Sequence, residues 1–230
     1  MFLNETKGPI LVVAPHPDDE TLAAGGTLLR ALEAGIEVHW LIVTGITVEN
    51  GWPEAKVSRR AEEIEEVASA YPFTRTHRLD LPSAALETLP LGEIVAAIGA
   101  VVKEVEPEVL LVPHRGDAHS DHHVVHAAAL ACSKWFRYPS VRAVLVYEAL
   151  SETDVGLFRS DPFEPQLFVD IGQQLERKLE LVELFGDEIG EHPFPRSRLT
   201  VESLARVRGA ASGYDAAEAF MILRMRDGPT

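Results

Sequence analysis

Apolar runs and amphipathic stretches alternate along the first two thirds of the chain. Short runs rich in Ile, Val and Leu predict buried strands, and segments with apolar residues three or four positions apart predict the helices between them. This alternation is typical of a parallel sheet covered by helices on both faces. We therefore expect an α/β fold of Rossmann-like, doubly wound type, with a mostly parallel sheet in the order 3-2-1-4-5.

The predicted elements span almost the whole sequence. Strands are expected at about 9–14, 36–44, 77–80, 109–113, 141–148, 167–170 and 217–225. Helices are expected at about 21–34, 57–71, 90–105, 121–136, 173–186 and 200–210. No repeat, low-complexity tract or linker divides the chain. We therefore expect a single domain over 1–230, with a core over about 1–150 and a C-terminal α/β extension over about 151–230.

A polar cluster follows the first predicted strand. Residues 14–20 read Ala-Pro-His-Pro-Asp-Asp-Glu, so one imidazole and three carboxylates collect where the strand reaches the surface. Imidazole nitrogens and carboxylate oxygens are ligand types suited to zinc and related divalent ions. Each carboxylate alone could equally belong to the first turn of a helix, where the helix dipole favours negative charge. His16, Asp18, Asp19 and Glu20 are thus metal candidates as a group.

A second polar cluster follows the fourth predicted strand and holds five of the nine histidines, His114, His119, His122, His123 and His126. In the order 3-2-1-4-5, strands one and four are neighbours, and ligands bind where their carboxyl ends meet. The two clusters should therefore lie together. His122 and His126 have the His-x-x-x-His spacing of zinc protease helices, but the glutamate of that motif is missing between them, so they are not the preferred pair.

Composition narrows the choice of partner and compartment. Asp and Glu number 36 against 21 Lys and Arg, and the formal charge of −15 opposes binding to nucleic acid or to anionic membranes. The single cysteine, Cys132, excludes an intrachain disulfide and agrees with a reducing compartment. No membrane span or signal-peptide pattern is present. We expect a cytoplasmic protein that acts on a small molecule.

The two clusters together closely resemble the LmbE/PIG-L superfamily of zinc-dependent de-N-acetylases, in particular the bacterial N-acetylglucosaminyl deacetylases. The motifs that carry this resemblance are residues 16–20, His-Pro-Asp-Asp-Glu, followed by Gly25-Gly26, and residues 115–122, Arg-Gly-Asp-Ala-His-Ser-Asp-His. Further similarities are at 147–148, 168–171, 192–197 and 217–220, so the resemblance covers nearly the whole chain. Ser120 stands where members usually carry proline, and Ala118 where many carry glycine. Neither change removes a chemical group.

The resemblance implies a role for each residue of the site. It implies one Zn²⁺ per chain held by His16, Asp19 and His122, although another divalent metal could occupy such a site. It implies that Asp18 is the general base, a role that the sequence alone does not separate from Asp19. It further implies that His119 stabilises the oxyanion and that Asp121 orients His119.

The implied reaction is hydrolysis of the acetamide of an N-acetylated amino sugar or its conjugate, by metal-activated water, in a homo-oligomeric enzyme. Candidate substrate-binding residues are Arg60, Asp117, His114 and Trp52. Arg196 and Arg198 lie in a proline-rich segment that could cover the site or a neighbouring subunit. Two alternatives stay open, a two-metal phosphoesterase and a non-catalytic module that binds a metal or nucleotide, which would have no need of a base at Asp18.

Overall fold

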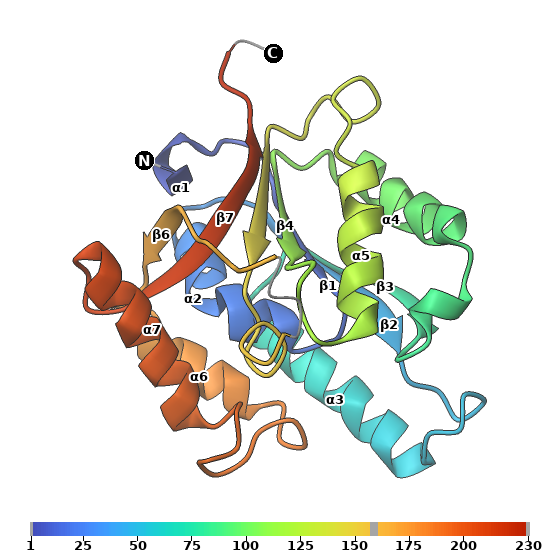
Figure 1. Ribbon diagram of the computed structural model, residues 1–230. Coiled ribbons are helices and arrows are strands. Elements are labelled where there is room, and N and C mark those ends of the chain that lie inside the picture. Colours follow the sequence, from blue (N-terminus) through green and yellow to red (C-terminus); the bar gives the residue numbers. More distant parts are fainter. Residues whose placement is uncertain (1, 157–160, 229–230) are drawn as a thin grey trace.

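The computed structural model describes residues 2–156 and 161–228 (Figure 1). Within these residues, seven strands form one sheet in the order β3-β2-β1-β4-β5-β7-β6. The strands are β1 (Ile10–Ala14), β2 (Val38–Gly45), β3 (Arg75–Pro82), β4 (Val109–Pro113), β5 (Ala143–Tyr147), β6 (Leu167–Asp170) and β7 (Ala217–Met225). Strands β1 to β5 are parallel, and β7 runs antiparallel to both β5 and β6. The predicted fold class and core order are confirmed.

Helices cover both faces of the sheet (Figure 1). The helices are α1 (Phe2–Glu5), α2 (Asp19–Glu33), α3 (Glu54–Ala70), α4 (Leu91–Val105), α5 (Ser120–Ala131), α6 (Leu175–Glu183), α7 (Arg198–Ser212) and the short 3-10 helix η1 (Leu86–Thr88). Apolar side chains of α2, α3, α6 and α7 pack on one face, and those of α4 and α5 pack on the other. The sequence pattern did not predict α1 or η1. No helix in the described part of the chain has the length and apolar character needed to cross a bilayer.

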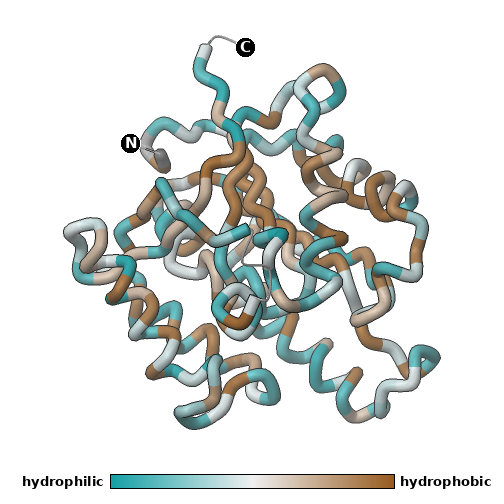
Figure 2. Tube along the Cα trace, viewed as in Figure 1, coloured by the Kyte–Doolittle hydropathy of each residue, from teal (hydrophilic) through white to brown (hydrophobic). Residues whose placement is uncertain are grey.

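Strand β1 shows why the central strands read as continuous apolar runs. All five of its residues are buried, because alternate side chains enter the two opposite cores. Ile10, Val12 and Ala14 belong to the core under α2, whereas Leu11 and Val13 belong to the core under α4 and α5. Figure 2 shows this apolar centre in brown, surrounded by more polar helices and loops.

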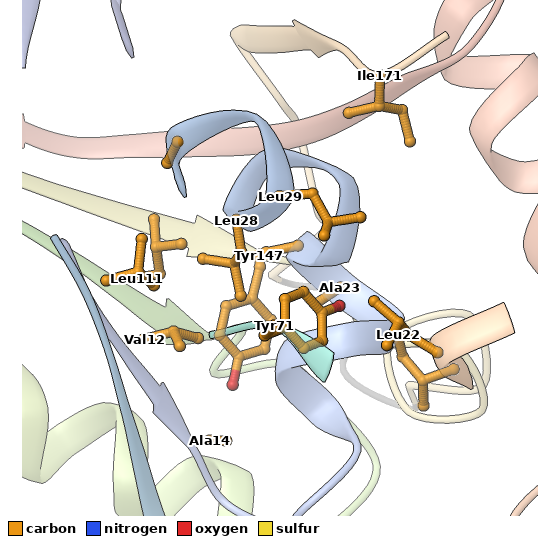
Figure 3. Close-up of a cluster of buried hydrophobic side chains, with 14 of the residues drawn as sticks. Val12, Ala14, Leu22, Ala23, Leu28, Leu29, Tyr71, Leu111, Tyr147 and Ile171 are labelled. Carbon is orange, nitrogen blue, oxygen red and sulfur yellow. The ribbon is translucent and has the colours of Figure 1, made fainter. Parts of the chain in front are cut away.

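Helix α2 packs closely against its neighbours because it contains Gly25 and Gly26. A Cβ atom on Gly26 would lie 2.7 Å from Cβ of Ile171, and one on Gly25 would lie 2.6 Å from the hydroxyl of Tyr71. Tyr71 and Ile171 are fully buried in the core that Figure 3 shows around α2. The glycine pair therefore serves helix packing, as its lack of a dinucleotide-loop spacing suggests.

A buried ion pair supports the middle of α2. Glu218 of β7 accepts hydrogen bonds from the backbone amides of Gly26 (2.9 Å) and Thr27 (2.7 Å) and from Nζ of Lys178 (2.7 Å). Lys178 of α6 also donates to the carbonyl oxygen of Leu22 at 2.8 Å. These contacts join α2 to α6 and β7, and they satisfy both buried charges.

Candidate active site

Strands β1 and β4 are hydrogen-bonded neighbours, so the loops that follow them lie side by side. His16 and Asp19 come from the first loop and its helix start, and His122 comes from the first turn of α5. The potential ligand atoms of these three residues all lie within 4.8 Å of one another. Oδ2 of Asp19 is 3.5 Å from Nδ1 of His16 and 3.4 Å from Nε2 of His122. The strand order thus brings together the residues that the sequence placed in two separate clusters.

The donor set fits a divalent metal. Nε2 of His122 is buried and has no hydrogen-bond partner among the described residues. An unpaired imidazole nitrogen beside a second imidazole and a carboxylate suits zinc, and three protein ligands leave a position for water or substrate. His16 also forms a second possible group with His119 and Asp121. The carboxylate of Asp121 already accepts from the backbone amides of Ala84 and Leu86, which favours the first group.

In both His16 and His122, one ring nitrogen contacts a carboxylate oxygen outside the three-residue group. Nε2 of His16 lies 3.0 Å from Oδ2 of Asp121, and Nδ1 of His122 lies 2.7 Å from Oδ2 of Asp117. Such pairs fix the orientation and tautomer of a metal-binding imidazole. The resemblance implies that Asp121 orients His119, but Oδ2 of Asp121 is 3.9 Å from His119 Nδ1, outside hydrogen-bonding distance, and it is the backbone amide of Asp121 that bonds this ring nitrogen. The carboxylate of Asp121 therefore interacts with the ring of His16.

Two adjacent carboxylates have opposite electrostatic surroundings. Burial and the charge of Asp19 raise the pKa of Asp18 to about 7, although Arg196 and His16 oppose the shift. Burial also raises the pKa of Asp19, but His122 and His16 outweigh it and hold that pKa well below its usual range. A carboxylate that stays charged suits a metal ligand, and one that titrates near neutral pH suits proton transfer. Sequence spacing could not separate these two residues, because the difference lies in their contacts.

The tautomer of His119 follows from one backbone contact. Its Nδ1 accepts a hydrogen bond from the amide of Asp121 at 3.1 Å, so Nε2 carries the proton in the neutral ring. Burial and the neighbouring His16 lower the pKa of His119. The side chain is 30% exposed and lies in the wall of the cavity described next. His119 is thus a neutral hydrogen-bond donor to that cavity.

A cavity of about 290 Å³ opens beside the cluster. Its wall includes Asp18, Asp19 and His119, together with Trp52 and Arg60, two of the predicted substrate-binding residues. Sequence reasoning did not assign Lys56 or Glu188 to the site, although both line this cavity. Neither residue lies in a recognisable motif, so only the fold reveals them.

The other two predicted substrate-binding residues lie elsewhere. Asp117 has no exposed surface and holds His122, as described above. His114 is buried and lines a separate cavity of about 410 Å³, next to Glu148 and Arg208. Asp117 and His114 are therefore not part of the wall of the cavity at Asp18.

A family model described as PIG-L, GlcNAc-PI de-N-acetylase, matches residues 11–133, which is more than half of the chain. The chain belongs to the PIG-L family. The expected membership of the LmbE/PIG-L superfamily is confirmed, and with it the expected enzyme class, the deacetylases that hydrolyse C–N amide bonds. The match includes all residues of the candidate metal cluster and ends before α6 and α7.

Individual relatives agree with this PIG-L assignment. The chain is 25% identical over 221 residues to the diacetylchitobiose deacetylase of Thermococcus kodakarensis, covering 91% of this chain and 80% of that protein. It is 28% identical over 162 residues to the 1D-myo-inositol 2-acetamido-2-deoxy-alpha-D-glucopyranoside deacetylase of Rhodococcus erythropolis, of which it spans 55%. A conserved protein of Thermus thermophilus has the same fold, with a TM-score of 0.76, 24% identity and 96% of each chain covered.

Proposed function

We propose that this PIG-L family member is a zinc-dependent hydrolase that removes the acetyl group from an N-acetylated amino sugar of the N-acetylglucosamine type, or from its conjugate. The observation that carries the proposal is the shared cavity wall, in which Asp18 and His119 stand beside the metal-binding cluster. The names of the relatives, both deacetylases of acetamido sugars, support the substrate class.

The roles of the side chains follow from their positions. A zinc ion held by His16, Asp19 and His122 would polarise the acetyl carbonyl and lower the pKa of water. Asp18 takes the proton of the attacking water and returns it to the departing amine. His119 donates a hydrogen bond from its Nε2–H group to the oxyanion that develops from the acetyl carbonyl oxygen. Asp121 and Asp117 keep the two metal-binding imidazoles in place.

Metal analysis combined with acetate release tests this proposal. We expect one zinc ion per chain and acetate release from at least one member of a panel of N-acetylglucosamine glycosides. The D18N variant should keep its zinc and lose turnover by on the order of 10² or more, since general acid–base catalysis contributes that much. The H122A variant should lose the metal itself. Parental acetate release by D18N would contradict the role of Asp18.

The same measurements separate the alternatives. Two metal ions per chain with release of phosphate from phosphate esters would indicate a phosphoesterase. Bound zinc without turnover on any substrate would indicate a binding module. We also propose a cytoplasmic homo-oligomer. The single buried cysteine supports the reducing compartment. Light scattering of the purified protein tests the oligomeric state.

A further inference from the structure

Arg196 reaches the active-site cavity from the segment between α6 and α7. Its Nη1 lies 3.5 Å from Oδ2 of Asp18, and its Nη2 lies 3.0 Å from Oε2 of Glu188. Arg196 is 178 residues away from Asp18 in the chain and outside the part that the family model matches. Among the described residues, Arg196 supplies the hydrogen bond to the carboxylate of Asp18.

The base belongs to a network of four charged groups of alternating sign. Glu188 binds Arg196 through one oxygen and Arg60 through the other. Nη1 of Arg60 donates to the carbonyl oxygen of Pro17 at 2.9 Å, which returns the network to the residue before Asp18. The side chains of Asp18, Arg196, Glu188 and Arg60 are 6%, 21%, 22% and 11% exposed. Such partly buried, linked ion pairs hold their geometry better than isolated surface pairs.

The backbone around Arg196 is also fixed. Ser197 is buried and caps α7, because its hydroxyl accepts from the amide of Thr200 at 3.2 Å. The guanidinium carbon of Arg196 lies 5.7 Å from the centre of the Phe194 ring, within the range of a cation–π contact. The arginine is therefore restrained by the cap on one side and by the aromatic ring on the other.

We propose that Arg196 is a positioning residue for Asp18. By binding Oδ2, it sets the rotation of the carboxylate and leaves Oδ1 to receive the proton of the attacking water. This role rests on the proposed deacetylase function. It assigns a part in the reaction to the C-terminal extension, and it gives an orienting partner to a buried carboxylate that has no other side-chain hydrogen bond among the described residues.

Two matched variants test the proposal, R196A and R198A. Arg198 lies two residues further along and pairs on the surface with Glu183 and Glu176, so it controls for loss of a guanidinium from the same segment. We expect R196A to keep its zinc content and its KM while kcat falls by on the order of 10²-fold, the cost of a small misplacement of a catalytic group. R198A should keep the parental kcat. Guanidinium ion added to R196A should restore part of kcat, which a general loss of stability would not allow.

The opposing results are equally specific. Parental kcat in R196A would overturn the proposal, and so would a raised KM with parental kcat, which would indicate a substrate contact instead. If R196A fails to fold, R196K decides, because lysine keeps the charge but loses the guanidinium fork. A lowered kcat with unchanged KM in R196K supports the role, and a parental kcat overturns it. If the parent protein releases no acetate from any substrate, the proposed function is wrong and this role falls with it, whereas an active R196A overturns the role alone.

Discussion

Nδ1 of His122 lies 2.7 Å from Oδ2 of Asp117, a carboxylate with no exposed surface. The other oxygen of Asp117 accepts a hydrogen bond from the hydroxyl of Thr153 at 2.6 Å. With Nδ1 occupied in this way, His122 presents its unpaired Nε2 to the metal cluster. Asp117 thus orients a nitrogen that is available to the proposed metal ion.

The D117N variant should bind zinc more weakly by about 10- to 100-fold, the usual cost of losing such a partner. The physical reason is that an amide can present its NH₂ group to Nδ1, which favours the wrong tautomer of His122. Competition with a chromophoric chelator measures the affinity. D154N, which changes an exposed carboxylate in the following segment, should bind zinc like the parent. Equal affinities of D117N and D154N would contradict this role.

The H119A variant distinguishes the two possible metal groups. If the metal is held by His16, Asp19 and His122, H119A should keep one zinc per chain. Its kcat should fall by about 10²- to 10³-fold, as expected when one oxyanion donor is removed. Elemental analysis gives the zinc content per chain, and acetate release from the same preparation gives kcat. Loss of the zinc would instead indicate that the ion is held by the second group, His16, His119 and Asp121.

The stability of the protein should depend on a histidine pair far from the active site. Nδ1 of His39 on β2 lies 3.1 Å from Nε2 of His77 on β3. One of these nitrogens must carry the proton of this hydrogen bond, and the other must be unprotonated to accept it. Burial lowers the pKa of both, and for His77 the neighbouring His39 and Arg75 lower it further. Around and below the ordinary histidine pKa of about 6.5 these two side chains therefore bind more protons in the unfolded chain than in the folded one. The contribution of the pair to the free energy of unfolding should fall as the pH falls through that value.

The H77Q variant isolates this effect, because glutamine can keep the hydrogen bond without titrating. Urea denaturation of parent and H77Q at several pH values between about 7.5 and 5.5 spans the titration of an unfolded histidine. The stability gap between the two proteins should change in favour of H77Q as the pH falls. A constant gap would show that the pair binds protons equally in the folded and unfolded states.

Two glycine-to-alanine changes in helices should have opposite effects. In G26A the new methyl group would meet Ile171 at 2.7 Å, and such overpacking costs about 1–3 kcal/mol. In G92A on α4 the new methyl group meets nothing within 4 Å, and alanine should stabilise the helix by up to about 1 kcal/mol. Chemical denaturation gives the free energy of unfolding of each variant relative to the parent. A G26A variant as stable as G92A would mean that α2 can move away from Ile171.

The sequence was sufficient for features that depend on periodicity and strand order. The burial of β1 and β4 is visible in their apolar runs, and their adjacency followed from the expected sheet order, which brought His16 and His122 together. The separate roles of Asp18 and Asp19 could not be predicted from spacing, because they depend on which charges each carboxylate faces after folding.

Contacts between residues that are far apart in the sequence also could not be predicted from the sequence. The link from Asp121 to His16 spans 105 residues, and that from Arg196 to Asp18 spans 178. Helix α6 packs on α2, α7 packs on α6 and on β7, and β7 runs antiparallel beside β5, which places Arg196 at the site. The only signal was an arginine in the proline-rich segment at 192–197, and its target was not visible there.

The ion pair of Lys178 and Glu218 has a consequence for engineering. It supports the helix that begins with Asp19, one of the candidate metal ligands, while the C-terminal extension also supplies Arg196 and Glu188 to the cavity wall. A chimera that imports this extension from a relative to change substrate preference would therefore also replace the support of the metal-binding helix. Specificity and metal retention would have to be transplanted together.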